Sequence, residues 1–470
     1  VMLNTVVKTA PEEISPSDVP KILKCLLSLE WTPAIFASKR RFFELAGLCD
    51  QAPREIDDLT SGARRIQQYM NGDLFFKDGN IFYILANNGG ESARQGQPFF
   101  RPDDEAQPEL EIGLLTQEEK DKANSLLDEF ATSVENAVKD ALDGRKTRYM
   151  EFDWVDKRFE YQRIEKVLSR IGEQSVVEFN SAELSDGEIE AAEALVDEQN
   201  RETLRNLSRA GFARESDVIG NRKDSEQLEV TISRLVDKGL LDQEYLLECK
   251  QTGSPLTRLD TPGKLENQSI GGLKCASCGS VYKDENLSKG YLLSDLGREL
   301  ISSSHWMEVW VTQRLVDAGI ALDSIYWNMA ESGEEIDIVV DILGQLWIFE
   351  LKDREFGAGD AYPLNYRQAR YGADKIFIIT TENVSKNAKR VFEEAVRESR
   401  GSRQDPVYIE GLDKTLETLE DQVNAASVRY ASHRLRPLAQ LSGFDIGKML
   451  AERLDQPAEI AVPQADEVPF

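Results

Sequence analysis

Apolar residues recur at helical spacing three times between residues 18 and 70. A different pattern follows, in which two short apolar runs flank Asp78 and Gly79. An Asp-Gly pair between apolar runs favours a tight turn, so these runs predict a β-hairpin. We therefore expect residues 1–86 to form an α+β domain of three helices followed by a hairpin.

Residues 228–241, LEVTISRLVDKGLL, predict a helix that ends before Gly239 and a strand that follows it. This segment resembles the recognition helix and first wing strand of winged-helix domains, which implies a winged-helix-like segment over 213–248. The order of elements in residues 1–86 resembles the same fold. Such modules bind DNA through that helix or dock against proteins. Acidic residues on the helix favour docking, because they would repel phosphate.

Residues 87–212 separate these two segments. The stretch 87–109 is rich in glycine, proline and polar residues, which is typical of a linker. An apolar stripe from Leu126 to Leu142 predicts a helix, and residues 182–211 are strongly acidic with a helical pattern. The sequence thus predicts a linker and an acidic helical region, in which no catalytic constellation is visible.

The pattern changes again in residues 291–435, where strands and helices alternate, ahead of a tail at 436–470. The strands expected at 345–353 and 375–380 are nearly continuous apolar runs, as in strands buried between helices. The alternation predicts an α/β sandwich. The other predicted elements are a helix within 293–319, strands at 324–330, 335–343 and 406–410, and helices at 362–372, 384–399 and 412–433.

Three charged residues interrupt these apolar strands. Asp337 lies on one strand, and Glu350 and Lys352 follow on the next, where alternation places both on one face of the sheet. A buried strand carries such charges only with a partner or a function. Carboxylates on adjacent strands can hold Mg²⁺ or Mn²⁺, and a lysine can stabilise charge on phosphate. An ion pair on an edge strand is the alternative.

The acid on one strand and the E-x-K on the next resemble the PD-(D/E)XK nuclease superfamily, within which the closest likeness is to restriction-endonuclease-like domains. The resemblance implies a multidomain α+β chain with a C-terminal restriction-endonuclease-like sandwich. It also implies that Asp337 and Glu350 are metal ligands and that Lys352 is the catalytic lysine. Glu308 corresponds to the acid on the first helix, and Gln368 to a helix glutamine near the site.

This resemblance implies a metal-dependent endonuclease, with DNA as the favoured substrate, in a restriction-type or antiviral role. Two other classes of function stay open. The chain could be a non-catalytic scaffold with a nuclease-like fold, or a sequence-specific DNA-binding regulator. The complete set of acids and lysine argues against the first, and the acidic recognition helix argues against the second.

Charge modifies this expectation. Acidic residues outnumber basic ones by 84 to 56, so the chain carries a net charge of −28 and repels nucleic acid on average. Such a nuclease is expected to remain inactive until an activating protein partner or a homo-oligomer presents the substrate. A phosphate-binding surface must be local, and residues 361–390 hold six basic residues against two acidic ones. We expect nucleic-acid contacts from Arg367, Arg370, Lys375, Lys389 and Arg390.

Cys249, Cys275 and Cys278 lie in two short glycine-containing turns within residues 249–290. The spacing resembles a zinc ribbon in which Thr252 stands in place of the fourth cysteine. The sequence leaves two alternatives open. In the first, the ribbon holds no metal. In the second, the three thiolates bind zinc weakly, and a water or a carboxylate completes the site.

The remaining features concern location. No run of about 18 apolar residues occurs, and the first residues do not have the pattern of a signal peptide. We therefore expect neither a membrane helix nor secretion. Five cysteines, an odd and sparse number, favour a reducing compartment, and hence the cytoplasm.

Overall fold

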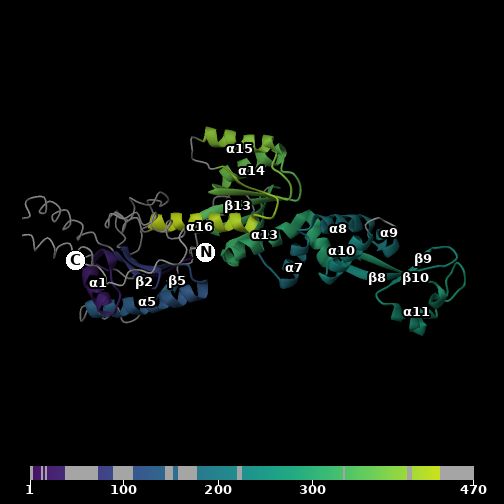
Figure 1. The fold of residues 1–470 in the computed structure, drawn as a ribbon, viewed down its shortest axis with the longest axis horizontal. Coiled ribbons are helices and arrows are strands. Elements are labelled where there is room, and N and C mark those ends of the chain that lie inside the picture. Colours follow the sequence, from purple (N-terminus) through teal and green to yellow (C-terminus); the bar gives the residue numbers. More distant parts are fainter. Residues whose placement is uncertain are drawn as a thin grey trace, which may run out of the picture. The chain divides into compact units, whose positions relative to one another are not determined.

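The computed structural model describes residues 4–11, 14–15, 18–36, 72–87, 109–142, 152–156, 177–219, 225–331, 334–399 and 405–434 of the 470. They fall into two compact units, one from within residues 1–162 and 420–470 and the other from within 163–419. Each unit combines helices with sheets (Figure 1), so the expected mixed α/β, multidomain organisation is confirmed.

The first unit is built on a sheet whose described strands run in the order β2-β3-β4-β1-β5, with antiparallel neighbours throughout. The aromatic rings of Trp31, Phe75, Phe82 and Phe130 pack together in its core. The elements are β1 (Asn4–Ala10), α1 (Val19–Ser28), β2 (Gly72–Lys77), β3 (Asn80–Asn87), β4 (Glu109–Thr116), α5 (Lys120–Ala141) and β5 (Val155–Asp156).

This sheet differs from the winged-helix-like domain expected over residues 1–86. The predicted hairpin is present as β2 and β3, but β4 pairs with both β3 and β1. The sheet therefore continues beyond residue 86, into the region where the sequence predicted a linker and a helical region. Pairing between β1 and β4 joins residues about a hundred positions apart, which local patterns do not reveal. The helices predicted at 38–48 and 56–70 lie outside the described residues.

The second unit contains a four-stranded sheet of described strands in the order β7-β10-β8-β9. Strand β10 pairs antiparallel with both β7 and β8, so residues 249–285 form an insertion between two paired strands. The ribbon expected at 249–290 is thus part of the same sheet as the segment expected at 213–248. The elements are α8 (Glu198–Ala210), β7 (Ala213–Arg214), α9 (Glu215–Val218), α10 (Ser225–Asp237), β8 (Leu241–Glu248), β9 (Pro255–Leu259), α11 (Gln268–Gly271) and β10 (Asn286–Leu293).

A six-stranded sheet of described strands, in the order β15-β14-β13-β12-β11-β6, carries the charged residues singled out above. Neighbours from β6 to β13 are antiparallel, whereas β13, β14 and β15 are parallel. The elements are β6 (Val177–Ser181), α7 (Asp186–Ala194), α12 (Asp295–Ile301), α13 (His305–Asp317), β11 (Ile325–Glu331), β12 (Glu334–Ile342), β13 (Gln345–Lys352), α14 (Ala358–Tyr371), β14 (Lys375–Thr380), α15 (Lys386–Glu398), β15 (Val407–Glu410) and α16 (Thr415–Arg434).

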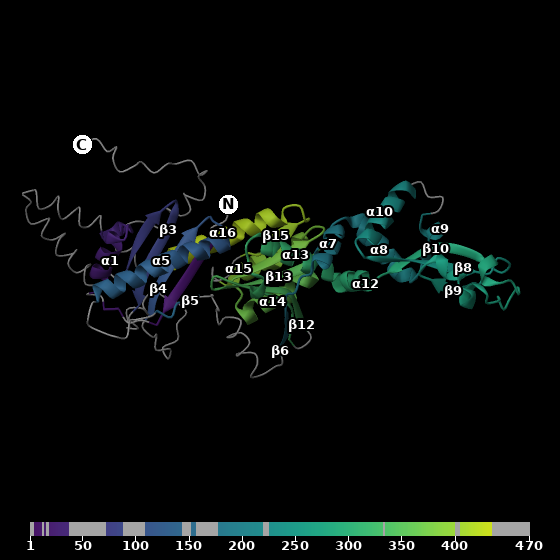
Figure 2. The ribbon, with the colours of Figure 1, turned by 90° about the horizontal axis from the view of Figure 1, so that it is seen from below.

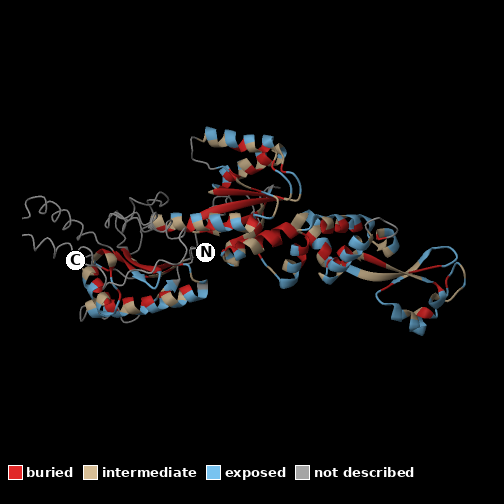
Figure 3. Ribbon diagram, viewed as in Figure 1, coloured by how far each residue is buried: buried red, intermediate tan, exposed pale blue. Residues whose placement is uncertain are grey.

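Helices cover both faces of this sheet. Helices α14 and α15 lie over one face and α13 over the other (Figure 1; Figure 2 gives the view from below). Leu364 of α14 and Phe392 of α15 share a core with Ile348 and Ile378 of the central strands. The strands are buried while the outward side of α15 is exposed (Figure 3). Leu346 and Ile348 of β13 belong to the core shared with α14 and α15, so even-numbered residues of this strand face these helices.

The predicted order of helices and strands in 291–435 is confirmed, with three differences. The helix expected within 293–319 is divided into α12 and α13, because Ser303 and Ser304 adopt positive φ angles of 51° and 62°. Strand β6 comes from residues 87–212, where the sequence predicts a linker and an acidic helical region, and it pairs with β11 at the edge of the described sheet. The boundary between the two units falls within α16, whose Ala431 belongs to the core of the first unit.

Candidate active site

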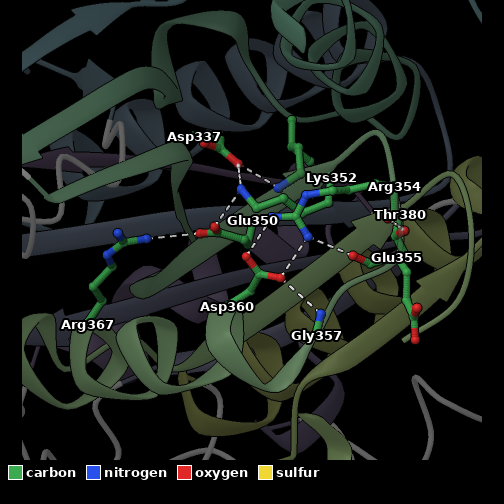
Figure 4. A network of polar contacts seen from close by, with 10 residues as sticks. Asp337, Glu350, Lys352, Arg354, Glu355, Gly357, Asp360, Arg367 and Thr380 are labelled. Atoms are coloured by element: carbon green, nitrogen blue, oxygen red, sulfur yellow. Dashed lines mark hydrogen bonds and ion pairs between the residues drawn. The ribbon is translucent and has the colours of Figure 1, made fainter. Parts of the chain in front are cut away.

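Asp337, Glu350 and Lys352 come together on the face of the sheet that α14 covers (Figure 4). Ile338 pairs with Phe349 across β12 and β13, so Asp337 and Glu350 occupy the next pair of positions. Lys352 Nζ lies 2.8 Å from Glu350 Oε1 and 3.9 Å from Asp337 Oδ2. The predicted cluster of two carboxylates and one lysine is thus present in the fold.

The Asp337 carboxylate is crowded by like charge. Its Oδ2 accepts a 2.6 Å hydrogen bond from the backbone N–H of Leu351. Burial, and then the charge of Glu350, nevertheless raise the pKa of Asp337 to about 8. Burial also opposes the charge on Lys352, but Asp337 and Glu350 outweigh it and raise the pKa of the lysine. Lys352 therefore stays protonated, while the positive charge near Asp337 is too small to stabilise its ionised form.

Arg367 of α14 supplies a second cation to the same cluster. Its Nη1 lies 3.1 Å from Glu350 Oε2, and the side chains of both residues are nearly buried. Glu350 therefore contacts Lys352 through one oxygen and Arg367 through the other. Among the five basic residues expected to contact nucleic acid, Arg367 is the one shown to form an ion pair with a predicted metal ligand, Glu350.

The N-terminus of α14 is fixed beside the site by an aspartate. Asp360 accepts a 2.9 Å hydrogen bond from the backbone N–H of Gly357 and forms a two-pronged ion pair with Arg354, at 2.8 and 2.9 Å. The hydrogen bond from Arg354 holds the pKa of Asp360 below its usual value. Arg354 follows Glu350 and Lys352 at alternate positions, so this continuation of the charged pattern is a signal in the sequence for a residue at the site.

Glu308 of α13 is buried with 7% of its surface exposed, and its charge contributes to the raised pKa of Asp337. Its Oε2 lies 2.5 Å from His305 Nδ1, and this hydrogen bond raises the pKa of His305. Asn328, at a positive φ of 52° on β11, donates to Glu308 and Glu335 at 3.0 Å when its amide nitrogen faces them. Glu308 is therefore a buried, partnered acid near the cluster, as predicted, while Asn328 was not foreseen.

The other predicted site residues are distributed unevenly. Gln368 lies on the buried side of α14, next to Arg367 in sequence, whereas Arg370 and Arg390 are exposed. Lys389 of α15 pairs with Glu410 at 3.1 Å. Arg370 and Arg390 are thus exposed on their helices, whereas Lys389 has a partner on the edge strand β15.

Lys375 lies apart from the other residues expected to contact nucleic acid. It is buried at the start of β14, in register with Trp347, and its Nζ lies 4.9 Å from the centre of that ring. Residues 347 and 375 face away from α14, on the side of the sheet opposite Glu350. Charge counts along a chain do not distinguish the two faces of a strand, so they group Lys375 with the other basic residues of 361–390.

A second cluster lies in the insertion between β8 and β10. Cys249, Cys275 and Cys278 are brought together, as the ribbon pattern predicts, and the fourth member is Glu285 rather than Thr252. The four ligand atoms lie within 4.8 Å of one another and could hold a metal ion. Sequence spacing did not single out Glu285, because it lies seven residues after Cys278 and outside both turns.

Comparison with known proteins assigns no family. No protein-family model and no curated protein matches the chain. The chain is similar to the crystal structure of protein VC1899 from Vibrio cholerae, at 14% sequence identity and a TM-score of 0.35. The similarity covers 56% of this chain and 62% of that one, so the chain spans less than two thirds of its length. Function must therefore be argued from the sites themselves.

None of the helices that the structure describes has both the length and the apolar character required to cross a bilayer.

Proposed function

We propose that the chain is a metal-dependent nuclease of the PD-(D/E)XK type that hydrolyses phosphodiester bonds, with DNA as the favoured substrate. The observation that carries the proposal is the convergence of Asp337, Glu350 and Lys352 on neighbouring strands, on a face covered by a helix. The order α13, β11, β12, β13, α14, β14 supports it, since the resemblance to PD-(D/E)XK nucleases implies the same order of helices and strands.

The donor set fits a hard divalent cation such as Mg²⁺ or Mn²⁺. Asp337 and Glu350 would hold the ion through carboxylate oxygens, the ligand type that these cations prefer. The raised pKa of Asp337 agrees, because a bound cation would supply the positive charge that this carboxylate lacks. When bound, such an ion favours ionisation of a water and neutralises charge on phosphate. Glu308 adds negative potential from α13.

The protein's own residues then have distinct tasks. Lys352 keeps its proton and can donate hydrogen bonds to an attacking water or to a phosphate oxygen that gains charge. Arg367 presents a planar guanidinium group that can bind phosphate through two donors. A phosphate that drew Arg367 away from Glu350 would also free that carboxylate oxygen for the metal.

Charge suggests how the activity is controlled. A net charge of −28 makes the encounter with a polyanion slow and sensitive to salt. We propose that a protein partner or self-association brings the substrate to the site, in a cytoplasmic restriction-type or antiviral role. The sheet of β7, β8 and β10 with helix α10 is the candidate docking module, since Glu226 and Glu229 are exposed on that helix.

One observation favours a second candidate, a non-catalytic scaffold. Lys352 and Arg367 already pair with both oxygens of Glu350, so this carboxylate is satisfied without a metal. The two candidates differ in what they require of Asp337, which lies 3.9 Å from Lys352 and stays crowded by Glu350. A scaffold has no use for that arrangement, whereas a metal site does.

The test is incubation of the purified chain with plasmid, linear duplex, single-stranded DNA and RNA, each in Mg²⁺, Mn²⁺ or EDTA. The nuclease proposal expects cleavage of at least one polymer with metal and none in EDTA. Because self-association is one expected route of activation, the reactions are repeated at high protein concentration. Cleavage that persists in EDTA, or metal-dependent cleavage unaffected by Glu350→Gln, would contradict the proposal.

A further inference from the structure

Two turns in the insertion between β8 and β10 are built alike. In the first, Cys249 N–H donates to Ser254 O at 2.9 Å and Gly253 N–H donates to Cys249 O at 2.7 Å. In the second, Cys275 N–H donates to Ser280 O at 2.8 Å and Gly279 N–H to Cys275 O at 2.9 Å. Both glycines adopt positive φ angles, 68° and 76°, that other residues rarely take. The same loop thus occurs twice, with a cysteine at its start each time.

These turns bring three thiols to one point. Cys249 and Cys275 are buried and Cys278 is partly exposed, and their sulfur atoms with one Glu285 oxygen lie within 4.8 Å of one another. Thr252 holds the position of Cys278 in the first turn, and its hydroxyl lies 3.0 Å from Ser254 Oγ. The Thr252 side chain also hydrogen-bonds with Cys249, but Glu285 supplies the fourth ligand atom of the cluster.

Glu285 is held in the orientation that a ligand needs. Its Oε2 accepts a 2.7 Å hydrogen bond from the backbone N–H of Lys250, and its Oε1 accepts one from Cys278 Sγ at 2.8 Å. Only 8% of the residue is exposed. One carboxylate oxygen is thus fixed by the backbone, as outer hydrogen bonds fix metal ligands, and the other points at the thiols.

We propose that Cys249, Cys275, Cys278 and Glu285 bind one Zn²⁺ ion as a closed, four-coordinate structural site. Three thiolates and one carboxylate suit zinc, whereas Mg²⁺ and Ca²⁺ prefer oxygen alone. Ligand sulfur atoms lie about 3.8 Å apart around tetrahedral zinc at its usual bond length, so the cluster needs to contract by only about 1 Å. The three thiols release their protons to solvent when the ion binds.

The site has a defined structural consequence. Glu248 and Asn286 form the last residue pair between β8 and β10. Cys249 and Glu285 are the next residues outward on each strand, and the two other cysteines come from the insertion itself. A zinc ion at this point therefore joins the ends of both strands to the second turn of the insertion. This inference does not depend on the nuclease proposal, because the two sites share no residue.

The test uses the full-length chain, expressed with zinc and dialysed against metal-free buffer, with bound metal measured by elemental analysis. The wild type is expected to retain one zinc per chain. Glu285→Gln keeps an oxygen for the hydrogen bond from Lys250 but is a poor ligand. It should weaken zinc binding, measured by competition with a chromophoric chelator, by about 100-fold or more, since loss of an outer partner alone costs 10–100-fold. Asp284→Ala removes the exposed neighbouring acid and serves as the matched control.

Cobalt gives a readout that does not rely on affinity. Co²⁺ added to the metal-free chain should produce the intense absorption of thiolate coordination together with a tetrahedral spectrum, and Cys278→Ser should reduce the thiolate band. A wild type that retains no zinc and gives no such spectrum would overturn the proposal. Equal zinc affinity in Glu285→Gln and the wild type would show that Glu285 is not the fourth ligand.

Discussion

The backbone N–H of Leu351 donates a 2.6 Å hydrogen bond to Asp337 Oδ2, which holds the carboxylate of β12 against β13 between Glu350 and Lys352. The bond is a consequence of the register, because Ile338 pairs with Phe349 and Asp337 is the next residue along β12. Two acids that repel each other are therefore held at a fixed spacing by the sheet. This arrangement is the basis of the predictions on the candidate active site.

The first prediction concerns pH and Asp337, whose pKa is raised to about 8 by burial and by Glu350. The folded chain holds this proton more tightly than the unfolded chain does. Without metal, the stabilisation is present below the ordinary pKa of about 4 and is lost as the pH rises towards 8. Denaturant unfolding in EDTA should show the free energy of unfolding falling more steeply with pH in the wild type than in Asp337→Asn. Parallel pH profiles for the two chains would contradict this account.

The second prediction concerns Lys352, which contacts both acids. Lys352→Ala should lower the cleavage rate by about 100-fold or more, because a preorganised donor is lost from the charge that develops on phosphate. Metal binding should persist, since both carboxylates remain. Rate and metal affinity are measured on the same preparation, with Lys386→Ala, an exposed lysine of α15, as the control. If Lys352→Ala lost metal binding but kept the wild-type cleavage rate per bound metal, Lys352 would not be a catalytic residue.

The third prediction concerns Arg367, which is paired with Glu350. Arg367→Gln should weaken substrate binding and reduce the slope of log affinity against log salt by about 0.7–0.9, the contribution of one phosphate contact. Arg397→Gln, an exposed arginine on α15, should leave the slope unchanged. The binding measurement uses Ca²⁺ in place of Mg²⁺ to limit cleavage. A normal salt slope in Arg367→Gln would mean that the arginine serves only the ion pair.

The fourth prediction concerns Asp353, the residue after Lys352. Its side chain is 4% exposed, and it forms ion pairs with Arg201, at 3.2 Å, and with Arg205. Trp306 and Thr381 also donate to it, at 3.3 and 3.1 Å. Asp353→Ala should cost about 3–5 kcal/mol of unfolding free energy, because it leaves the buried Arg201 without its counter-charge.

Urea unfolding in EDTA measures this cost without a contribution from metal. Glu398→Ala at the exposed end of α15 is the control for a surface acid and should change the free energy of unfolding by less than about 0.5 kcal/mol. A small effect in Asp353→Ala would indicate that water reaches Arg201 and replaces the lost partner.

Much of the second unit could be predicted from sequence, because its strands carry their own signals. KIFIIT forms β14 at the predicted residues, and the charges that interrupt β12 and β13 converge where alternation places them. Local pattern was sufficient because β11, β12 and β13 are consecutive and pair with their neighbours in the chain. The carboxylate cluster follows from that local pairing.

The features that were missed depend on distant pairing or on the direction of a side chain. Strands β1 and β4 find each other across a long separation, and β6 joins a sheet whose other strands begin after residue 324. The basic stretch 361–390 predicts a phosphate contact from Lys375, but its strand turns this residue towards Trp347. Glu285 became visible as a ligand only once β10 had brought it back beside Cys249.

The central claim is tested most directly by cleavage with matched variants of Glu350. Wild type, Glu350→Gln and Asp337→Asn are incubated with plasmid and with single-stranded DNA and RNA in Mg²⁺ or Mn²⁺, after each chain is shown to be folded. The account predicts metal-dependent cleavage by the wild type and a loss of about 1000-fold or more in both variants, because each removes a ligand of the hydrolytic ion. Cleavage by both variants at the wild-type rate would contradict it.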